Sequence, residues 1–183
     1  MTRTQRVGLS AVAAVVIAVA CATVISGGAT AATPTGQPTK IQPAAGPTCT
    51  DPRSNVTRNA TVVGTSGPDV IWARAGDVIA TLAGDDTVFS DQAGPDVLVC
   101  LGDGADFFGP SAVAGPVAGG FAVLGEGGRD MLMGGDGADY LVGGAGADIH
   151  YGGSGTDIGD PGPDIDVCSV EVDVTGTCEY RSP

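Results

Sequence analysis

The stretch Gly125–Asp160 reads GEGGRDMLM GGDGADYLV GGAGADIHY GGSGTDIGD, which is four consecutive blocks of nine residues. Every block starts with glycine and has an aspartate as its sixth residue, at Asp130, Asp139, Asp148 and Asp157. Leucine follows two places after the aspartate in the first two blocks. A fixed period of this kind is typical of repeat architectures, in which each unit is one piece of supersecondary structure.

The aspartate column continues on both sides of this stretch. Upstream, its spacings are 8, 9, 10 and 10 residues, at Asp69, Asp77, Asp86, Asp96 and Asp106. Downstream, Asp166 lies nine residues after Asp157, and Asp164 occupies a position where the pattern prefers glycine. The column is absent between Asp106 and Asp130, so we expect an inserted loop near Pro110–Gly120, with a strand resuming at residues 121–124.

Each unit divides into a short strand and a glycine-rich turn. The triplets after aspartate, such as MLM, YLV, VIW and TVF, predict strands whose central residue faces inward, at Ile71, Ile79, Val88, Leu98, Phe108, Leu132 and Leu141. Glycine permits the positive φ values of the turns. Two units then form one flattened coil of 18 residues. His150 and Gly159 occupy the inward position in the last two blocks: we expect His150 to pack inside and Gly159 to loosen the roll.

Stacking of such coils predicts a metal site. Strands stack about 4.8 Å apart, so aspartates 18 residues apart become neighbours on adjacent coils. Two calcium–oxygen bonds of about 2.4 Å, placed end to end, span the same distance. We expect one calcium ion between Asp130 and Asp148, one between Asp139 and Asp157, and one between Asp148 and Asp166, with turn carbonyls as further ligands. The predicted ligands are Asp69, Asp77, Asp86, Asp96, Asp106, Asp130, Asp139, Asp148, Asp157 and Asp166.

Without a cation, the stacked carboxylates repel one another by about 1 to 3 kcal/mol per pair. Calcium makes the same geometry attractive, so folding and metal binding are expected to be coupled. Many carbonyl ligands and few waters favour calcium over magnesium. The off-column acids Asp85, Asp91, Asp103, Asp136 and Asp160 are predicted to be solvated.

Composition excludes several classes of protein. The chain of 183 residues has 21 acidic and 8 basic residues, which makes nucleic acid an improbable partner. The 31 glycines follow no period of three, so the chain is not collagen-like. The 43% of hydrophobic residues is too high for a disordered acidic tail.

The N-terminal region predicts export. Two arginines, an apolar run over residues 7–25 and small residues at Ala29–Ala31 are typical of a secretory signal peptide over residues 1–31, with cleavage after Ala31 or Ala32. The alternatives are a retained membrane anchor and lipidation of Cys21. Residues 32–48, rich in proline and threonine, are interpreted as a spacer, and residues 49–183 as one roll domain. We expect a secreted or cell-surface-attached protein that is not stably inserted in a membrane.

Four cysteines remain after removal of the signal peptide. An even number in an exported chain predicts disulfides, although free thiols are the alternative and three pairings exist. Cys168 with Cys178 is the local choice, which leaves Cys49 with Cys100. These bonds are expected to close the two ends of the repeat.

From these residues the chain resembles the RTX, or hemolysin-type calcium-binding, repeat family. The resemblance extends over Gly64–Asp166 and is strongest in GGDGADYLVGGAGADIHYGGSGTD, from Gly134, and good in GTSGPDVI, from Gly64. DVCSVEVDVTGTCE, from Asp166, is similar to the cysteine-closed end of small secreted members. The resemblance implies an all-β fold, a parallel β-roll (β-solenoid) with calcium in glycine-rich turns. Toxin activity is not implied, because large RTX toxins are similar only in the repeats.

Three classes of function remain. The first is a secreted calcium-binding protein that folds with its metal and is not an enzyme. The second is a cell-surface adhesion or partner-binding module that calcium makes rigid, which a contiguous exposed aromatic patch would favour. The third is a secreted hydrolase, which has little support because a catalytic site would need His150, the only histidine, from inside a narrow coil.

Overall fold

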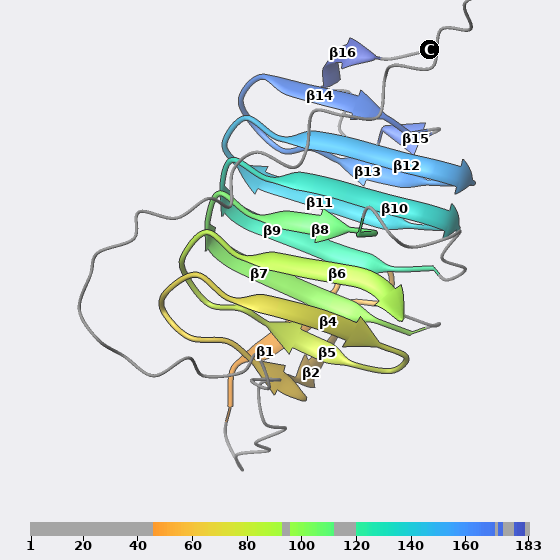
Figure 1. Cartoon of the computed structure of the whole chain (residues 1–183). Helices are drawn as coiled ribbons and strands as arrows, with labels where there is room; N and C mark the ends of the chain where they lie inside the picture. The colour runs from red at the N-terminus through yellow and green to blue at the C-terminus, as the bar shows by residue number, and fades with distance from the viewer. Residues whose placement is uncertain (1–45, 93–95, 112–119, 171, 174–177, 182–183) are drawn as a thin grey trace, which may run out of the picture. The chain divides into compact units, whose positions relative to one another are not determined.

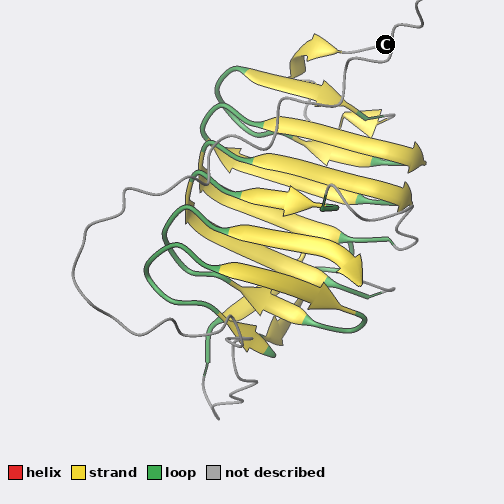
Figure 2. Cartoon of the chain, in the orientation of Figure 1, coloured by secondary structure: helices red, strands yellow, loops and turns green. Residues whose placement is uncertain are grey.

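The computed structural model describes residues 46–92, 96–111, 120–170, 172–173 and 178–181. These residues form β-strands and turns and contain no helix, so no helix among them could cross a membrane (Figure 2). The expected signal peptide, Cys21 and most of the spacer lie outside the described residues. The all-β part of the sequence prediction is confirmed.

Two parallel seven-stranded sheets face each other, and the chain alternates between them (Figure 1). The sheet nearer the viewer in Figure 1, called the front sheet, contains β4 (Val70–Arg74), β6 (Thr87–Gln92), β8 (Phe107–Gly109), β10 (Met131–Gly137), β12 (Ile149–Gly155), β14 (Asp166–Ser169) and β16 (Cys178–Arg181). The back sheet contains β3 (Val62–Val63), β5 (Val78–Ala80), β7 (Leu98–Gly104), β9 (Ala122–Gly128), β11 (Tyr140–Ala145), β13 (Ile158–Asp160) and β15 (Val172–Asp173). The fold is therefore a parallel β-roll, as predicted.

The register fixes the length of each coil. Met131 pairs with Ile149, and Ile149 with Val167, so the last full coils have the predicted 18 residues. Earlier coils differ: successive pairs of the front sheet are Val70 with Thr87, Thr87 with Phe107, and Phe107 with Met131. The longest of these coils contains the expected insertion, of which residues 112–119 lie outside the description. The strand after it begins at Ala122, close to the expected position.

One narrow apolar core fills the space between the sheets. Six of the predicted inward residues belong to this core, namely Ile71, Ile79, Val88, Phe108, Leu132 and Leu141. The assignment of Leu98 was wrong, because Val99 pairs with Ile79 and takes the inward position. Leu98 is buried on the outer side of the back sheet. His150 is buried at 1% exposure and pairs with Leu132, as a packing residue would.

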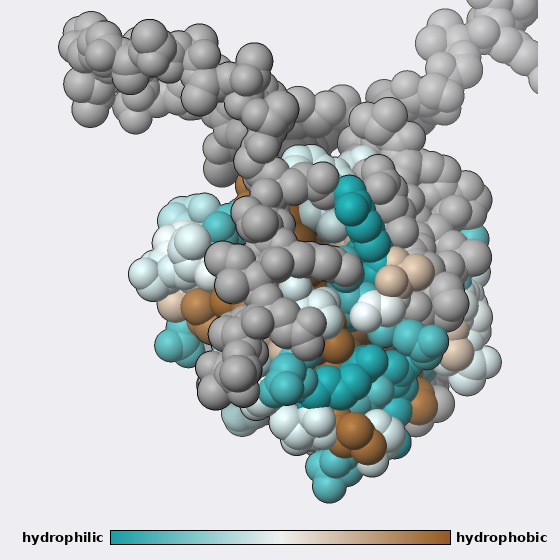
Figure 3. All heavy atoms as spheres, turned by 90° about the horizontal axis from the view of Figure 1, so that it is seen from below, coloured by the Kyte–Doolittle hydropathy of each residue, from teal (hydrophilic) through white to brown (hydrophobic). Residues whose placement is uncertain are grey.

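An antiparallel hairpin of β1 (Thr48–Asp51) and β2 (Val56–Asn59) covers the N-terminal part of the outer side of the back sheet, at β5, β7 and β9. The Cys49–Cys100 disulfide joins this hairpin to β7, and the Cys168–Cys178 disulfide joins β14 to β16. Both predicted pairings are confirmed. Figure 3 views the N-terminal end of the roll, where hydrophilic residues surround small hydrophobic patches on the visible described surface.

Candidate metal centre

Six aspartates form one row along the roll, which we call the front row because each precedes or begins a front strand. In this row the backbone N–H of each aspartate donates a hydrogen bond to Oδ1 of the aspartate one coil later. The donor–acceptor distances are 2.8, 2.7, 2.9, 2.8 and 2.8 Å along Asp69, Asp86, Asp106, Asp130, Asp148 and Asp166. The nine-residue pattern therefore brings these six predicted ligands together.

The second row, called the back row, is interrupted. Its register positions are Asp77, Val97, Phe121, Asp139 and Asp157. The amide N–H of Phe121 donates to Asp139 Oδ1 at 2.8 Å, and that of Asp139 to Asp157 Oδ1 at 2.9 Å. Two apolar residues thus separate Asp77 from the other aspartates of this row.

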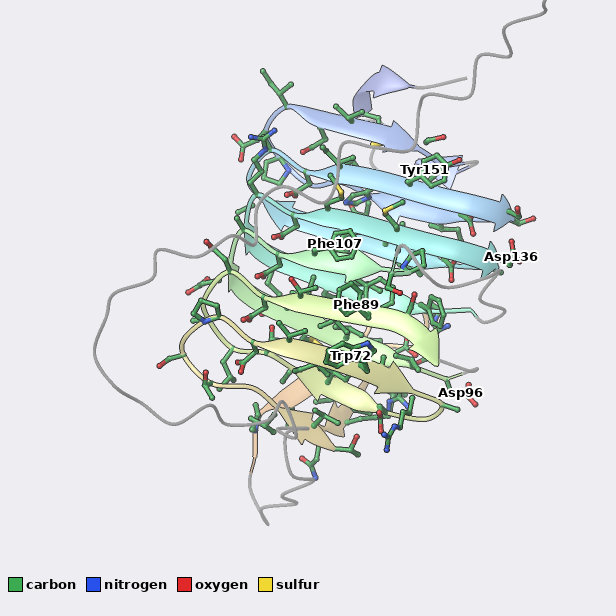
Figure 4. All side chains as sticks on the ribbon, in the orientation of Figure 1. Trp72, Phe89, Asp96, Phe107, Asp136 and Tyr151 are labelled. Atoms are coloured by element: carbon green, nitrogen blue, oxygen red, sulfur yellow. A yellow bond between two sulfur atoms is a disulfide. The ribbon has the colours of Figure 1, made fainter. Side chains whose placement is uncertain are left out.

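Asp96 does not lie in the back row, contrary to the sequence prediction. Val78 pairs with Leu98, so Val97 is the neighbour of Asp77 and Asp96 lies one residue before the row. Asp96 is exposed, with a φ of 66°, and Figure 4 shows it at the edge of the roll. The extra residues in this coil shift the register, which a column drawn through uneven spacings could not reveal.

The carboxyl groups of the rows are buried. Asp106, Asp130, Asp139 and Asp148 are each exposed by 3% or less. In each of them Oδ1 accepts a backbone hydrogen bond, whereas Oδ2 is buried without a hydrogen-bond partner. An unsatisfied buried polar atom costs about 1 to 3 kcal/mol, and more if it is charged. These oxygens therefore require either a proton or a cation.

Burial changes the acidity of the same groups. It raises the pKa of Asp130 to about 7 and that of Asp139 to about 7, with repulsion from the neighbouring carboxylates adding to the effect. Burial also raises the pKa of Asp106, to about 6, and that of Asp148. The protein alone thus disfavours negative charge in the rows near neutral pH. A bound cation would remove this penalty.

The first glycine of each nonapeptide lets oxygen atoms approach its Cα closely, and we call the place where these oxygens converge a gap. A side-chain carbon on Gly125 would collide with Asp130 Oδ2 and lie 2.5 Å from the Gly143 carbonyl oxygen. At Gly134 the corresponding atoms are Asp139 Oδ2 and, at 2.6 Å, the Gly152 carbonyl oxygen.

At Gly143 the atoms are Asp148 Oδ2, the Pro161 carbonyl oxygen and, at 2.9 Å, His150 Nε2. A carboxylate oxygen and a carbonyl oxygen from the next coil therefore converge in front of each of these glycines. Each gap lies beside the first aspartate of an expected pair, Asp130, Asp139 or Asp148, and faces the next coil.

In the N-terminal part of the front row Gly64 has the same arrangement, because a side-chain carbon there would lie 2.7 Å from Asp69 Oδ2 and 2.6 Å from the Thr81 carbonyl oxygen. The next two positions differ. Leu101 has the register position of Gly125, and Thr81 has that of Leu101. Both side chains are completely buried, Leu101 belongs to the inner core, and the Thr81 hydroxyl donates to the Leu101 carbonyl oxygen. These side chains occupy the room that glycine leaves open further along the row. At the first coil, Asp69 Oδ2 already accepts a hydrogen bond of 2.6 Å from the Thr65 N–H.

Side chains alone do not form a metal cage in the described part of the chain, where no three His, Cys, Asp or Glu groups come together. Ligands from backbone carbonyls are therefore required. Among the off-column acids Asp85 and Asp103 are exposed, and Asp136 and Asp160 are half-buried, while the Asp91 side chain lies outside the described residues. Asp85 Oδ1 accepts the Ala105 N–H at 3.0 Å, so it links two adjacent coils.

Sequence reasoning missed two features of the site. The first is the role of the first repeat position, which decides whether oxygen atoms or a side chain occupy the gap. The sequence has glycine there in the last four blocks and Thr81 and Leu101 in earlier ones. The second is Arg53 of the β1–β2 hairpin, whose Nη1 donates to the Gly120 carbonyl oxygen at 3.2 Å beside the interrupted back row. Its guanidinium lowers the pKa of Asp139 slightly against the larger effect of burial. No local pattern connects Arg53 with this row.

The comparison with known families agrees with this geometry. A family model of the RTX calcium-binding nonapeptide repeat matches the chain in four copies, over residues 56–88 and 124–158. The chain contains RTX calcium-binding repeats. The second matched segment holds the three glycine-lined gaps, and the unmatched residues between the two segments include Leu101 and Val97. β-Rolls of RTX repeats are typically structural and calcium-binding rather than catalytic. No curated protein and no solved structure matches the chain.

Proposed function

We propose that this is an exported calcium-binding protein whose roll folds together with its metal. The observation that carries the proposal is the pairing of a buried, unsatisfied Asp Oδ2 with a carbonyl oxygen of the next coil, in front of a glycine, at Gly125, Gly134 and Gly143. At Gly125 and Gly134 the polar atoms that converge are all oxygens, the ligands of a hard cation, while His150 Nε2 also lies near Gly143.

Five residues supply the carboxylates of the three proposed sites: Asp130, Asp139, Asp148, Asp157 and Asp166. Calcium would supply positive charge at the gaps, and the turn carbonyls would complete its shell of six to eight oxygens. Asp148 borders two gaps of the front row, because it follows Asp130 and precedes Asp166. The larger, geometrically tolerant calcium ion suits such a shell better than magnesium, which retains water.

The other five predicted ligands lie outside these three gaps. Asp69 is satisfied by Thr65, Asp96 is exposed, and Arg74 N–H donates to Asp77 Oδ2 at 3.0 Å. Asp86 and Asp106 belong to coils in which Thr81 and Leu101 fill the first repeat position. We therefore infer that calcium is concentrated in the C-terminal half of the roll.

Coupling of folding to calcium follows from the buried acids. Closing the roll without metal leaves carboxyl groups either charged and unsatisfied or protonated at a raised pKa. Since the unfolded chain has no preformed gap, the free energy of calcium binding adds directly to the free energy of folding. Export is supported by the N-terminal pattern and the two disulfides, and extracellular fluid would supply calcium.

Two other functions are weighed against this one. A surface adhesion or partner-binding module is favoured by a specific feature of the front sheet, developed below. A hydrolase has no support from the described residues, because His150 is buried inside the roll. We infer that the protein is not an enzyme, and activity of the purified protein on ester or peptide substrates would contradict this.

Circular dichroism of the mature chain tests the proposal. The β-structure is expected to form cooperatively as calcium is added and to disappear with a chelator, while magnesium at the same concentration is much less effective. Equal spectra and equal melting temperatures with calcium and with chelator would contradict coupled folding.

A further inference from the structure

The outer face of the front sheet carries a continuous uncharged stripe. It consists of the first and third residues after each front-row aspartate, two columns of side chains across six strands, which we call the front stripe. None of its twelve residues is charged, although the chain has a net charge of −13. Five of the eight exposed large hydrophobic residues in the described part of the chain lie on it: Val70, Trp72, Met131, Tyr151 and Val167.

Aromatic rings follow one another along this stripe. The Trp72 and Phe89 ring centroids are 5.4 Å apart, and those of Phe89 and Phe107 are 6.2 Å apart. Tyr151 is 51% exposed on the same face, further towards the C-terminus. Figure 4 shows the four rings in succession along the front sheet. The stripe is therefore the contiguous aromatic patch that the sequence alone could not establish.

The outer face of the back sheet is partly covered, whereas that of the front sheet is exposed. On the back sheet, the apolar residues Val78, Leu98 and Ala122 are buried with Cys49 of the hairpin, which the Cys49–Cys100 disulfide holds in place. No described strand packs over the front stripe. A contiguous exposed apolar patch on a soluble protein usually marks an interaction site.

Dimensions and charge limit the occupant. Six strands about 4.8 Å apart, with two side-chain columns about 7 Å apart, give a stripe of roughly 200 Å² that is long and narrow. A stable interface with a second copy buries about 800 Å² on each partner, so the stripe is too small to hold one. Acidic turns flank it, which disfavours anionic ligands.

An extended peptide is also a poor fit. Strand addition requires free backbone N–H and C=O groups, and these lie at the edges of a sheet rather than on its face. What a row of aromatic rings can bind is a series of flat rings with apolar faces, as in the stacking platforms of single-strand-binding proteins. A sugar ring presents an apolar C–H face to such a platform and keeps its hydroxyl groups in water at the rim.

We propose that the front stripe binds a linear, uncharged polysaccharide that runs along the axis of the roll, with sugar rings stacked on Trp72, Phe89 and Phe107. The rigid roll holds these rings in place before binding, so little ordering entropy is lost when the ligand binds. The inference rests on the folded roll and not on the number of calcium ions. Because folding is checked in every binding assay, a failure of polysaccharide binding is distinguished from a failure of calcium-coupled folding.

Binding is tested with cellulose, chitin, mannan and starch as probes, using the full mature chain in calcium and confirming its fold by circular dichroism. At least one probe is expected to retain the protein, and Trp72→Ala is expected to weaken binding at least tenfold. Tyr140→Ala, on the outer face of the back sheet, is the matched control and should leave binding unchanged. Trp72 is the only tryptophan, so soluble oligosaccharides of the retained polymer should also change its fluorescence.

Three results would overturn this proposal. The first is that none of the four polymers retains the folded protein. The second is that Trp72→Ala and Tyr140→Ala bind equally well. The third is self-association of the folded protein in analytical ultracentrifugation, lost in Trp72→Ala, which would assign the stripe to a second copy instead.

Discussion

Replacing Gly125 with alanine should remove one calcium site without removing any charge. The added carbon would enter the space where Asp130 Oδ2 and the Gly143 carbonyl oxygen converge. Gly125 does not have a positive φ, so alanine is tolerated by the backbone. A compatible Gly→Ala change stabilises proteins by about 0.4 to 1 kcal/mol through the unfolded chain. A loss of stability would therefore combine the loss of calcium with steric overlap on the Gly143 carbonyl, and calcium stoichiometry separates the two.

The size of the loss follows from ligand linkage. A site at a free calcium concentration one hundred times its Kd contributes about 2.7 kcal/mol to the free energy of unfolding. For a domain of this size the loss corresponds to a fall in Tm of roughly 10 °C. The bound calcium should decrease by one ion per molecule, because only the gap between Asp130 and Asp148 is filled.

Gly127→Ala is the matched control, two residues further along the same turn. A carbon there meets only Asp103 Oδ1, at 3.2 Å, and the Asp103 side chain is exposed and can move away. Its stoichiometry should be that of the wild type and its stability within about 1 kcal/mol. Calorimetric calcium titration and thermal melting at one fixed free calcium concentration measure both variants. Equal effects of the two substitutions, or unchanged stoichiometry in Gly125→Ala, would refute the reasoning.

Three further predictions concern the aspartates of the front row, the protonation of the buried aspartates and the disulfide of the hairpin. Asp148→Ala should abolish two ions by calorimetry because Asp148 borders two gaps. Asp136→Ala removes the same charge from the C-terminal end of β10, outside the rows, and should alter affinity only slightly. Equal losses would mean that diffuse charge binds the metal. Burial raises the pKa of Asp130 and Asp139 to about 7. The folded metal-free chain therefore binds more protons than the unfolded chain between about pH 4 and 7. The stability that these protons contribute is lost as pH rises through 7. Metal-free protein should therefore show more β-structure by circular dichroism at pH 5 than at pH 8, and the opposite order would contradict this assignment of the acids. Finally, Cys49→Ala/Cys100→Ala removes a disulfide that closes 51 residues and contributes about 4 kcal/mol, whereas the disulfide removed by Cys168→Ala/Cys178→Ala contributes about 3 kcal/mol. The first double variant should therefore be the less stable of the two in denaturant melts. The reverse order would mean that the hairpin is not structurally important.

The regular part of the sequence predicted the fold well for a physical reason. A strict period of nine places each aspartate beside its equivalent one coil later, so Asp130, Asp148 and Asp166 could be aligned by counting alone. The glycines fix the turns and the apolar residues fix the inward face, and both signals are local. Cysteine pairing was accessible because Cys168 and Cys178 are close in sequence, which left Cys49 with Cys100. The Cys49–Cys100 bond holds the hairpin on β7, however, and does not close the end of the roll as expected.

The irregular part could not be predicted in the same way. Once coils differ in length, a column of aspartates no longer fixes the register. Asp96 was predicted in the back row and Leu98 in the core, but the structure places Val97 and Val99, one residue further along, at these positions. The front stripe and Arg53 depend on which face the hairpin covers, and that is a tertiary property without a sequence period. The closed gaps at Thr81 and Leu101 required knowledge of what a side chain at the first repeat position would meet.

A crystal structure of the mature chain grown in calcium, with ions located by anomalous scattering, tests the central claim most directly. The account predicts ions in the gaps in front of Gly125, Gly134 and Gly143, each bound by aspartate and backbone carbonyl oxygens, and no ion where Leu101 fills the front row. Ions distributed over the exposed acids Asp85, Asp96 and Asp103, with the three glycine gaps empty, would contradict it.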